Sequence, residues 1–221
     1  MAVNIDFHVH TDLSPDGQVA INEVVTAAKR RGLHGVAVTD HNEIENALKL
    51  KESPTANDYI VIVGEEIRTS AGEITGLFLK EFIPPGLSPE ETIRRIKSQG
   101  GLVVVPHPFC RLRKSKLKIQ TLKQIAPLVD IIEVFNARNV FKADNRKARE
   151  FALEHKKLMV VGSDGHLAYE YGRAYVKIKS CVTAEDCKKN LSSAEFVNSS
   201  SPLWVHAVTK WRKIKKSLIA V

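Results

Sequence analysis

Short apolar runs alternate with segments of helical periodicity through most of the 221 residues, and this alternation restricts the chain to few folds. Several runs are apolar at every position, such as residues 35–38 (GVAV) and 59–63 (YIVIV). Continuous apolar runs are typical of parallel strands that are buried on both faces. Right-handed crossovers would wind such strands into a barrel or an open sheet, so the sequence predicts an α/β fold.

The order of the expected elements follows from periodicity and from capping residues. Ser88 precedes Pro89 and Glu91 in a pattern typical of a helix start, and Thr183 caps another helix. Residues 199–202 form a short linker, so we expect one domain over 1–198 and a linker with a basic helix over 199–221. Strands are expected at 4–8, 35–39, 59–63, 102–105, 130–135 and 158–161, a hairpin at 67–69 with 74–79, an edge strand at 174–178, and helices at 19–31, 43–51, 88–99, 120–126 and 142–155.

Composition excludes several classes of protein. A hydrophobic fraction of 43% is too high for a globally disordered chain. No apolar run is long enough to cross a bilayer and residues 1–10 lack a signal-peptide pattern, so we expect no membrane partner. The three cysteines, Cys110, Cys181 and Cys187, have no CxxC spacing. Their odd number favours buried thiols in a reduced, cytoplasmic setting over a disulfide scaffold.

The net charge of +8 comes largely from two basic segments, residues 111–118 and the tail at 210–216. A basic surface suits anionic partners such as nucleotides, nucleic acid or acidic lipids. A solvated face that aids solubility is the alternative, and for the tail we favour this alternative.

Side chains that ligate metals follow most of the apolar runs. His8 and His10 lie two residues apart on a strand, so they emerge on the same side, and Asp164 and His166 repeat this spacing after residues 158–161. Because parallel strands end at the same edge, one pocket with more than one divalent ion is predicted. The fragments are HVH at 8–10, DG at 16–17, TDH at 39–41, GEE at 64–66, HP at 107–108 and GSDGH at 162–166.

Some fragments leave a choice between residues or roles. Glu65 and Glu66 are adjacent on a strand, so one must point away, and we choose Glu65 as the carboxylate that faces the ions. Asp40 either ligates or orients a ligating imidazole, and an ordinary helix cap is the alternative. Prolines on both sides of His107 stiffen the backbone that carries it. The remaining histidines are expected to be structural: His34, His155 and His206.

The motif order HxH, DG, TDH, GEE, HP and GSDGH resembles the PHP superfamily, named for polymerase and histidinol phosphatase, from about Ile5 to His166. The resemblance implies a distorted (β/α)7 barrel that cleaves phosphate esters. It also implies two or three ions of manganese, zinc or iron at the C-terminal ends of the strands. The implied ligands are His8, His10, Glu65 and Asp164 for one ion, Glu65 and His107 for a second, and Asp16, His41 and His166 for a third.

Glu73 marks a departure from the family pattern. Many PHP proteins carry a GHI-like motif after the third strand, and its histidine binds the second metal. Here residues 72–74 read GEI. We expect Glu73 to be an oxygen ligand, which shifts the preference toward harder ions such as manganese. A surface hairpin residue, which leaves a site for two ions, is the alternative.

We therefore predict metal-dependent hydrolysis of a phosphate ester, either a nucleotide, an oligonucleotide or a small phosphorylated metabolite. Two close cations would activate water and neutralise phosphoryl oxygens, and added cationic side chains would bind the phosphate. The alternatives are a nuclease that grips DNA or RNA with the basic loop and tail, a metal-binding module without turnover, and a hydrolase of non-phosphate bonds. Candidate catalytic residues are Asp40, Arg111 and Arg113, and candidate substrate-binding residues are Arg111, Arg113, Asn136, Arg138 and Arg173; for each arginine a surface ion pair is the alternative.

Overall fold

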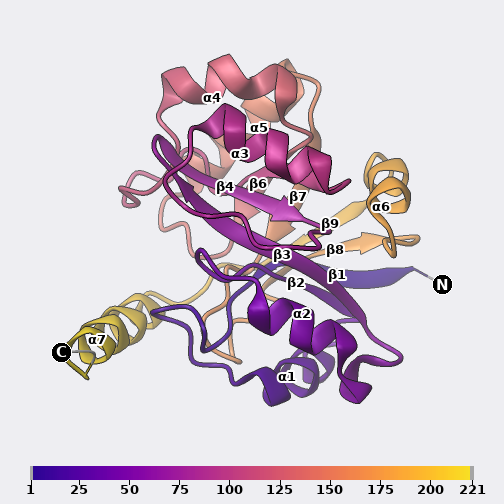
Figure 1. Ribbon diagram of the computed structural model, residues 1–221, viewed down its shortest axis with the longest axis vertical. Coiled ribbons are helices and arrows are strands. Elements are labelled where there is room, and N and C mark those ends of the chain that lie inside the picture. Colours follow the sequence, from indigo (N-terminus) through magenta and orange to yellow (C-terminus); the bar gives the residue numbers. More distant parts are fainter. Residues whose placement is uncertain (1, 220–221) are drawn as a thin grey trace.

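The computed structural model describes residues 2–219, and their strands form a nearly closed mixed α/β barrel (Figure 1). Within this range nine strands pair in the order β7-β6-β5-β4-β3-β2-β1-β8-β9. A parallel bridge between Val9 and Gly165 joins the ends of β1 and β7, and so brings the two sides of the sheet together. The predicted distorted barrel is confirmed.

Six strands pair in parallel, and they set the position of the site. Strands β1, β2 and β3 pair in parallel, as do β5, β6 and β7. Strand β4 is antiparallel to both β3 and β5, which joins the two halves in one orientation. The strands are β1 (Val3–Val9), β2 (Gly35–Val38), β3 (Ile60–Thr69), β4 (Gly72–Leu77), β5 (Leu102–Val105), β6 (Ile131–Asn136), β7 (Leu158–Gly162), β8 (Ala174–Ile178) and β9 (Glu195–Asn198).

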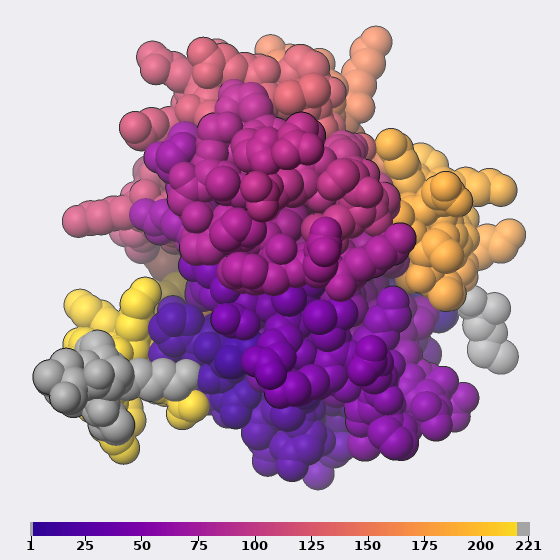
Figure 2. All heavy atoms as spheres, viewed as in Figure 1, coloured from indigo at the N-terminus to yellow at the C-terminus, as the bar shows by residue number. Residues whose placement is uncertain are grey.

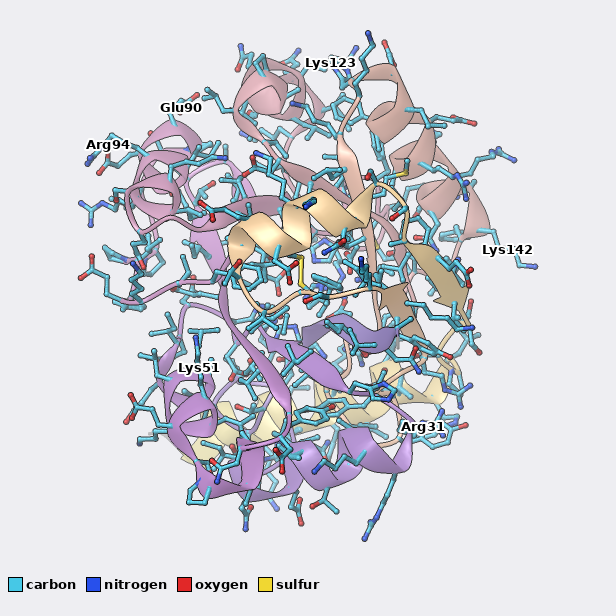
Figure 3. The ribbon with its side chains drawn as sticks, turned by 90° about the vertical axis from the view of Figure 1, so that its right-hand side faces the viewer. Arg31, Lys51, Glu90, Arg94, Lys123 and Lys142 are labelled. Atoms are coloured by element: carbon cyan, nitrogen blue, oxygen red, sulfur yellow. A yellow bond between two sulfur atoms is a disulfide. The ribbon has the colours of Figure 1, made fainter. Side chains whose placement is uncertain are left out.

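Helices connect the strands and turn their charged sides outward. Arg94, Lys123 and Lys142 project from three helices into solvent (Figure 3). The predicted caps are present, because Ser88 Oγ accepts from Glu91 N and Thr183 Oγ1 accepts from Asp186 N. The helices are α1 (Val24–Arg30), α2 (Glu45–Glu52), α3 (Pro89–Ser98), α4 (Ile119–Ile125), α5 (Lys142–Glu154), α6 (Ala184–Leu191) and α7 (Trp204–Ile219), with short 3-10 turns at Ile21–Glu23, Pro54–Ala56 and Ala126–Leu128.

The core fills the barrel and the layer between sheet and helices. Every residue of β2 and β5 is buried, as their unbroken apolar sequences predict. Ile5, Ile62, Ile67 and Leu77 are among the largest side chains that are fully buried. Each contributes roughly 1.5–3 kcal/mol of hydrophobic stabilisation. The rigid strands then hold their C-terminal ends, and the side chains there, in fixed positions.

Three expectations about the fold are wrong. Strand β3 does not stop at Val63 but continues to Thr69, because β4 pairs with its second half. Strand β8 is not an edge strand, since the unpredicted β9 pairs with it. A disulfide between Cys181 and Cys187 joins the segment after β8 to α6, drawn as a yellow bond in Figure 3. The packing of these two segments brings the two cysteines together. The odd number of cysteines did not suggest a disulfide.

The C-terminal helix α7 projects from one side of the molecule, next to indigo residues from the first part of the chain (Figure 2), whereas the N-terminus lies on the opposite side (Figure 1). Its Val205 and Thr209 are buried against the barrel, whereas Trp204, Lys210 and Trp211 are exposed. No helix within residues 2–219 combines the length and hydropathy needed to span a bilayer. The division of the chain after residue 198 stays a prediction.

Candidate metal centre

The predicted metal-ligand side chains gather at the C-terminal ends of the parallel strands. They form four overlapping groups of three residues, and within each group the ligand atoms lie within 4.8 Å of one another. The groups are His8, His10 and Glu66; His8, His107 and Asp164; His10, His41 and His166; and His41, Glu66 and Glu73.

Glu66 lies at the centre of this cluster. Its Oε2 is 3.4 Å from Nε2 of both His8 and His10 and 3.1 Å from His41 Nδ1. Its Oε1 is 2.8 Å from His107 Nε2. Burial alone would raise the pKa of this carboxyl, but His41 and His8 hold it well below the usual range. Glu66 is therefore a buried, ionised carboxylate in contact with four imidazoles.

Glu65 faces the other side of β3, so the expectation that it faces the ions is wrong. Its Oε2 accepts a hydrogen bond from Ile83 N at 3.0 Å, and burial raises its pKa to about 8. A parallel bridge between His41 and Glu66 fixes which of the two glutamates points inward. That bridge depends on tertiary pairing, which two adjacent glutamates in a sequence do not reveal.

Asp164 approaches the cluster from the turn after β7. Its Oδ1 is 3.3 Å from His10 Nε2 and 3.7 Å from His8 Nε2. Its Oδ2 accepts from Asn136 Nδ2 at 3.1 Å and also pairs with Arg113. Asp164 has a φ of 52°, a left-handed conformation that costs of order 1–3 kcal/mol in a residue with a Cβ. The packed turn holds this strained backbone, which keeps the carboxylate within reach of the histidines.

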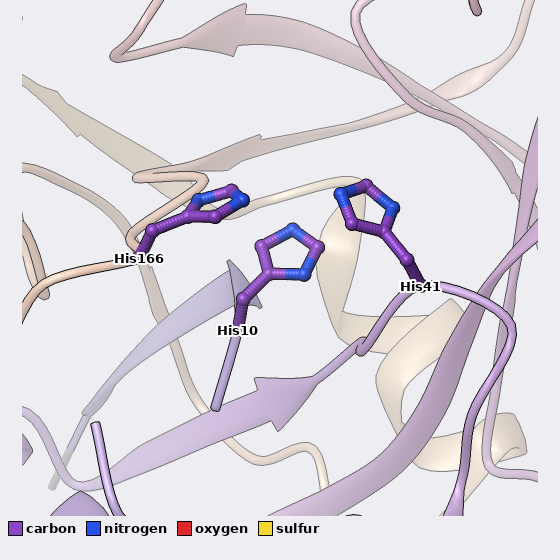
Figure 4. Close-up of side chains that lie close together, drawn as sticks. All are labelled: His10, His41 and His166. Carbon is purple, nitrogen blue, oxygen red and sulfur yellow. The ribbon is translucent and has the colours of Figure 1, made fainter. Parts of the chain in front are cut away.

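His41, His166 and Asp16 form the outer part of the cluster, next to His10. The ring of His10 lies between those of His166 and His41, with centroids 4.2 and 4.5 Å away (Figure 4). Asp16 Oδ1 is 3.2 Å from His166 Nε2 and 3.8 Å from His41 Nε2. Burial lowers the pKa of His10 well below its usual range, and burial with Arg138 lowers that of His166 to about 3. Neutral imidazoles present the lone pairs that metal binding needs.

Glu73 lies at the site rather than on a free hairpin surface. Its side chain is 7% exposed, and its Oε2 is 3.9 Å from His107 Nε2. Its Oε1 is 3.7 Å from Arg68 Nη1 at the mouth of the site. The structure therefore places a carboxylate where the resemblance led us to look for one, and ligation by Glu73 stays a prediction.

Divalent cations fit this donor set. Several buried donor atoms have no hydrogen-bond partner, among them Asp16 Oδ1, Glu73 Oε2, Asp164 Oδ1 and His166 Nε2. An unsatisfied buried polar atom costs about 1–3 kcal/mol, and a coordinated cation would remove that cost. Mixed imidazole and carboxylate donors suit manganese, zinc and iron.

Glu133 supports the cluster, although the sequence analysis missed it. Its Oε1 is 3.0 Å from His8 Nδ1, and its Oε2 accepts from His107 N at 2.6 Å. Burial would lower the pKa of His8, but Glu133 and Glu66 raise it to about 10. The same negative field favours a bound cation. A glutamate inside the apolar run IIEVF is the signal that could have identified it, because buried carboxylates are rare without a partner.

Asp40 supports the site indirectly, through Thr11 and Ser14. It accepts hydrogen bonds from Thr11 N at 2.7 Å, Thr11 Oγ1 at 2.6 Å and Ser14 Oγ at 2.6 Å. Ser14 Oγ is in turn 3.1 Å from His10 Nδ1. Of the two roles considered for Asp40, the geometry fits the one that orients an imidazole.

The proposed arginines divide into those at the site and those elsewhere. Arg113 pairs with Asp164, and Arg138 is 3.0 Å from His166 Nδ1. Arg111 instead pairs with Asp144 at 2.8 Å and stacks on Phe141. Arg173 lies over the Tyr169 ring. Arg111 therefore makes the surface ion pair that was the alternative for each arginine, Arg173 packs on an aromatic ring, and neither lines a cavity above the donor cluster.

A cavity of about 380 Å³ opens above the donor cluster. Its walls carry more cationic than anionic side chains, which favours an anionic ligand. A smaller cavity of about 200 Å³ shares Asp16 and Arg113 with it and reaches Arg138, His166 and His206. The lining of the larger cavity is Pro15, Asp16, His41, Asn42, Arg68, Glu73, Arg113, Lys114, Ser115 and Lys213.

Comparisons with known proteins agree with this geometry. Residues 6–182 match the PHP domain family. An uncharacterized protein of Methanocaldococcus jannaschii, MJ1587, is 41% identical over 143 residues, which are 60% of this chain and 81% of that protein. A two-domain protein from Bacteroides vulgatus, which contains a predicted PHP-like metal-dependent phosphoesterase, has a similar structure, with a TM-score of 0.72 and 19% identity; the match covers 90% of this chain and 65% of that chain. Endonuclease Q, in a complex with a 27-mer duplex substrate, has a TM-score of 0.63 and 16% identity, covering 87% of this chain and 57% of that chain.

Proposed function

From the premise that this chain belongs to the PHP domain family, we propose that it is a metal-dependent phosphoesterase. Its substrate would be a phosphate ester of a nucleotide, an oligonucleotide or a small metabolite. One observation carries the proposal: a buried carboxylate, Glu66, contacts four imidazoles directly beneath a cavity with cationic walls. The donors suit divalent cations, and the walls suit phosphate.

The donor cluster would hold two or three ions of manganese, zinc or iron through His8, His10, His41, Glu66, His107, Asp164 and His166, with Asp16 and Glu73 at its edges. When bound, these ions would lower the pKa of water and neutralise the charge of the phosphoryl oxygens. Glu133 would hold the His8 ring and the His107 backbone directly, and Asp40 would hold the His10 ring through Ser14.

The chain's own cations would position the substrate. Arg113 and Lys114 line the cavity above the cluster, where they can donate to phosphoryl oxygens. Phosphoryl transfer needs mainly positioning and charge stabilisation, so donors that are already in place lower its barrier. Asn136 donates to Asp164 and Glu133 instead, and it would act on the substrate only through them.

A metal-supplemented activity screen tests this proposal. The purified protein would be assayed with manganese, zinc or iron against a generic phosphomonoester, a phosphodiester, a mononucleotide and a short RNA. We expect turnover of at least one ester that a chelator abolishes and that added metal restores. Absence of turnover on every substrate, with metal content verified by elemental analysis, would contradict the proposal.

The two adjacent glutamates provide a matched pair of variants for the same assay. E66Q removes the charge at the centre of the cluster, so metal content and turnover should both fall by about 100-fold or more, beyond the loss typical of a supporting residue. E65Q makes the same chemical change one residue away, on the opposite face of β3. It should retain both properties, and equal losses in the two variants would contradict the assignment of the inward face.

A nuclease is the second candidate function. The cationic cavity wall favours it, and endonuclease Q shares the fold. A nuclease that binds several backbone phosphates should lose affinity steeply as salt rises, by about 10³-fold or more between 50 and 200 mM. Binding of a short oligonucleotide to the metal-free protein, measured at several salt concentrations, would separate this function from hydrolysis of a small phosphate ester.

A further inference from the structure

The C-terminal helix α7 is joined to the metal centre by one buried side chain. Arg138 is only 6% exposed. Its Nη1 is 3.0 Å from His166 Nδ1, and its Nη2 donates to Val205 O at 3.3 Å and to Thr209 Oγ1 at 2.9 Å. A basic helix that served solubility alone would not need a buried arginine as its anchor.

A second charged group holds this arginine in place. The Nε atom of Arg138 is 3.1 Å from Glu170 Oε1, and the Glu170 side chain is fully buried. Glu170 Oε2 also accepts from His166 N at 3.1 Å. Before α7 begins, Ser201 N donates to Ala137 O at 2.8 Å. The start of α7 is therefore fixed to the segment that follows β6.

This anchorage brings the next turn of α7 to the substrate cavity. Lys213 lies four residues after Thr209, so the two share one face of the helix. Lys213 lines the larger cavity together with Asp16, His41 and Arg113. Lys210 and Trp211 are exposed and line neither of the two cavities above the cluster. Only one face of the basic helix thus meets the site.

We propose that α7 forms a wall of the substrate cavity and that Lys213 binds the phosphate group of the substrate. The proposal rests on the proposed function, because it places a substrate phosphate in this cavity. Arg138 and Thr209 are positioning residues in this arrangement, since they hold α7 but do not reach the cavity space that Lys213 lines. The linker after residue 198 and α7 would then complete the site rather than follow it as a separate tail.

The positions of the tryptophans make the proposal measurable without turnover. The chain has two tryptophans, Trp204 and Trp211, and both lie on α7. Tryptophan fluorescence, excited at a wavelength where tyrosine does not absorb, therefore reports on this helix alone. Inorganic phosphate would be titrated into the full-length protein, first without metal and then with metal, while tryptophan fluorescence is followed. Calorimetry would measure phosphate affinity in parallel.

We expect phosphate to change the fluorescence saturably. K213A should weaken phosphate binding about tenfold, since a charge-assisted hydrogen bond is lost. K213R retains the charge and should bind within about threefold of the unmodified protein. K210A removes a lysine of the same helix that lines neither cavity, and it should bind as the unmodified protein does. In a turnover assay K213A should raise KM and leave kcat nearly unchanged.

Two outcomes would overturn the proposal. One is K213A with unchanged phosphate affinity, and the other is a loss of phosphate affinity in K210A as large as that in K213A. Both are distinguishable from failure of the proposed function. A protein that hydrolyses no ester but loses phosphate affinity in K213A supports the role of Lys213, whereas an active enzyme that is indifferent to K213A contradicts it.

Discussion

The base and the mouth of the site are built by different parts of the chain. The base consists of His8, His10, Glu66, His107 and Asp164, whose side chains are at most 4% exposed and lie on strands or directly after them. The mouth consists of Arg68, Arg113 and Lys213, which come from the end of β3, from the loop after β5 and from α7, and the candidate ligands Asp16 and His41 lie between base and mouth.

This difference separates two tasks. Strand register fixes the base, so its donors meet at set distances and suit ion binding. The mouth depends on contacts between distant segments, such as the contact of Arg138 with Thr209. We therefore expect changes at the base to affect metal affinity, and changes at the mouth to affect substrate affinity.

Apart from E66Q, the largest effect is expected from E133Q, which changes a residue that supports the base. Glu133 accepts from His107 N and contacts His8 Nδ1, and an amide cannot accept in both places. Metal affinity should fall about 10- to 100-fold, as is typical when a partner of a ligand is removed. Calorimetric metal titration would measure it, with E154Q on the exposed face of α5 as control. Unchanged affinity would mean that the base does not depend on Glu133.

A smaller effect is expected from S14A, between base and mouth. Ser14 Oγ accepts from His41 N, donates to Asp40 and contacts His10 Nδ1. Its loss frees the His10 ring to rotate, so metal affinity should fall about tenfold. S192A removes an exposed hydroxyl of the same size and provides the control. A larger effect on KM than on metal affinity would place Ser14 with the mouth instead.

The base was largely predictable from the sequence, because metal-ligand residue types followed apolar runs that become parallel strands. Two errors at the base have one cause. The choice between Glu65 and Glu66 needs the phase of β3 against β2, and the apolar run around Glu133 suggests a buried carboxylate without showing which side of β6 it faces. Local periodicity predicts that a strand exists, but the pairing of strands decides which side chain faces inward.

For the mouth, the sequence predicted that arginines would be present but not which arginines lie at the site. Among the arginines, Arg113 and Arg138 lie at the site, whereas Arg111 and Arg173 do not. The place of each arginine side chain depends on contacts between loops and helices that are far apart in the sequence. Arg138, for example, contacts His166, 28 residues away, and Thr209, 71 residues away. Strand β9 was also not predictable, because it is short and partly exposed and therefore has no continuous apolar pattern.

At the mouth, T209V should change substrate affinity without changing metal affinity. Valine has nearly the shape of threonine but cannot accept from Arg138 Nη2, so α7 would be held less firmly. We expect KM to rise about threefold at constant kcat, with T209S as the control that retains the hydroxyl. Loss of metal affinity in T209V would show that base and mouth are one coupled unit rather than two independent parts.

The smallest effect on the site is expected at the opposite end of the barrel, where Asp130 precedes β6. Its carboxylate accepts from Val103 N at 2.9 Å and pairs with Lys97 and Lys188. Burial would raise its pKa, but these partners lower it. A lowered carboxyl pKa stabilises the fold above the pKa of the unfolded chain, about 3.9, and this stabilisation is lost as pH falls further.

D130N should therefore lower the free energy of unfolding by about 1 kcal/mol at pH 7 and by progressively less as the pH falls below about 4. Urea unfolding at several pH values would measure it. Metal affinity and KM should stay unchanged, because the N-terminal ends of the strands carry neither base nor mouth. A change in metal affinity or KM would mean that the substitution shifts β6 and, with it, Glu133. The position of the donors would then depend on the whole barrel rather than on the strand ends.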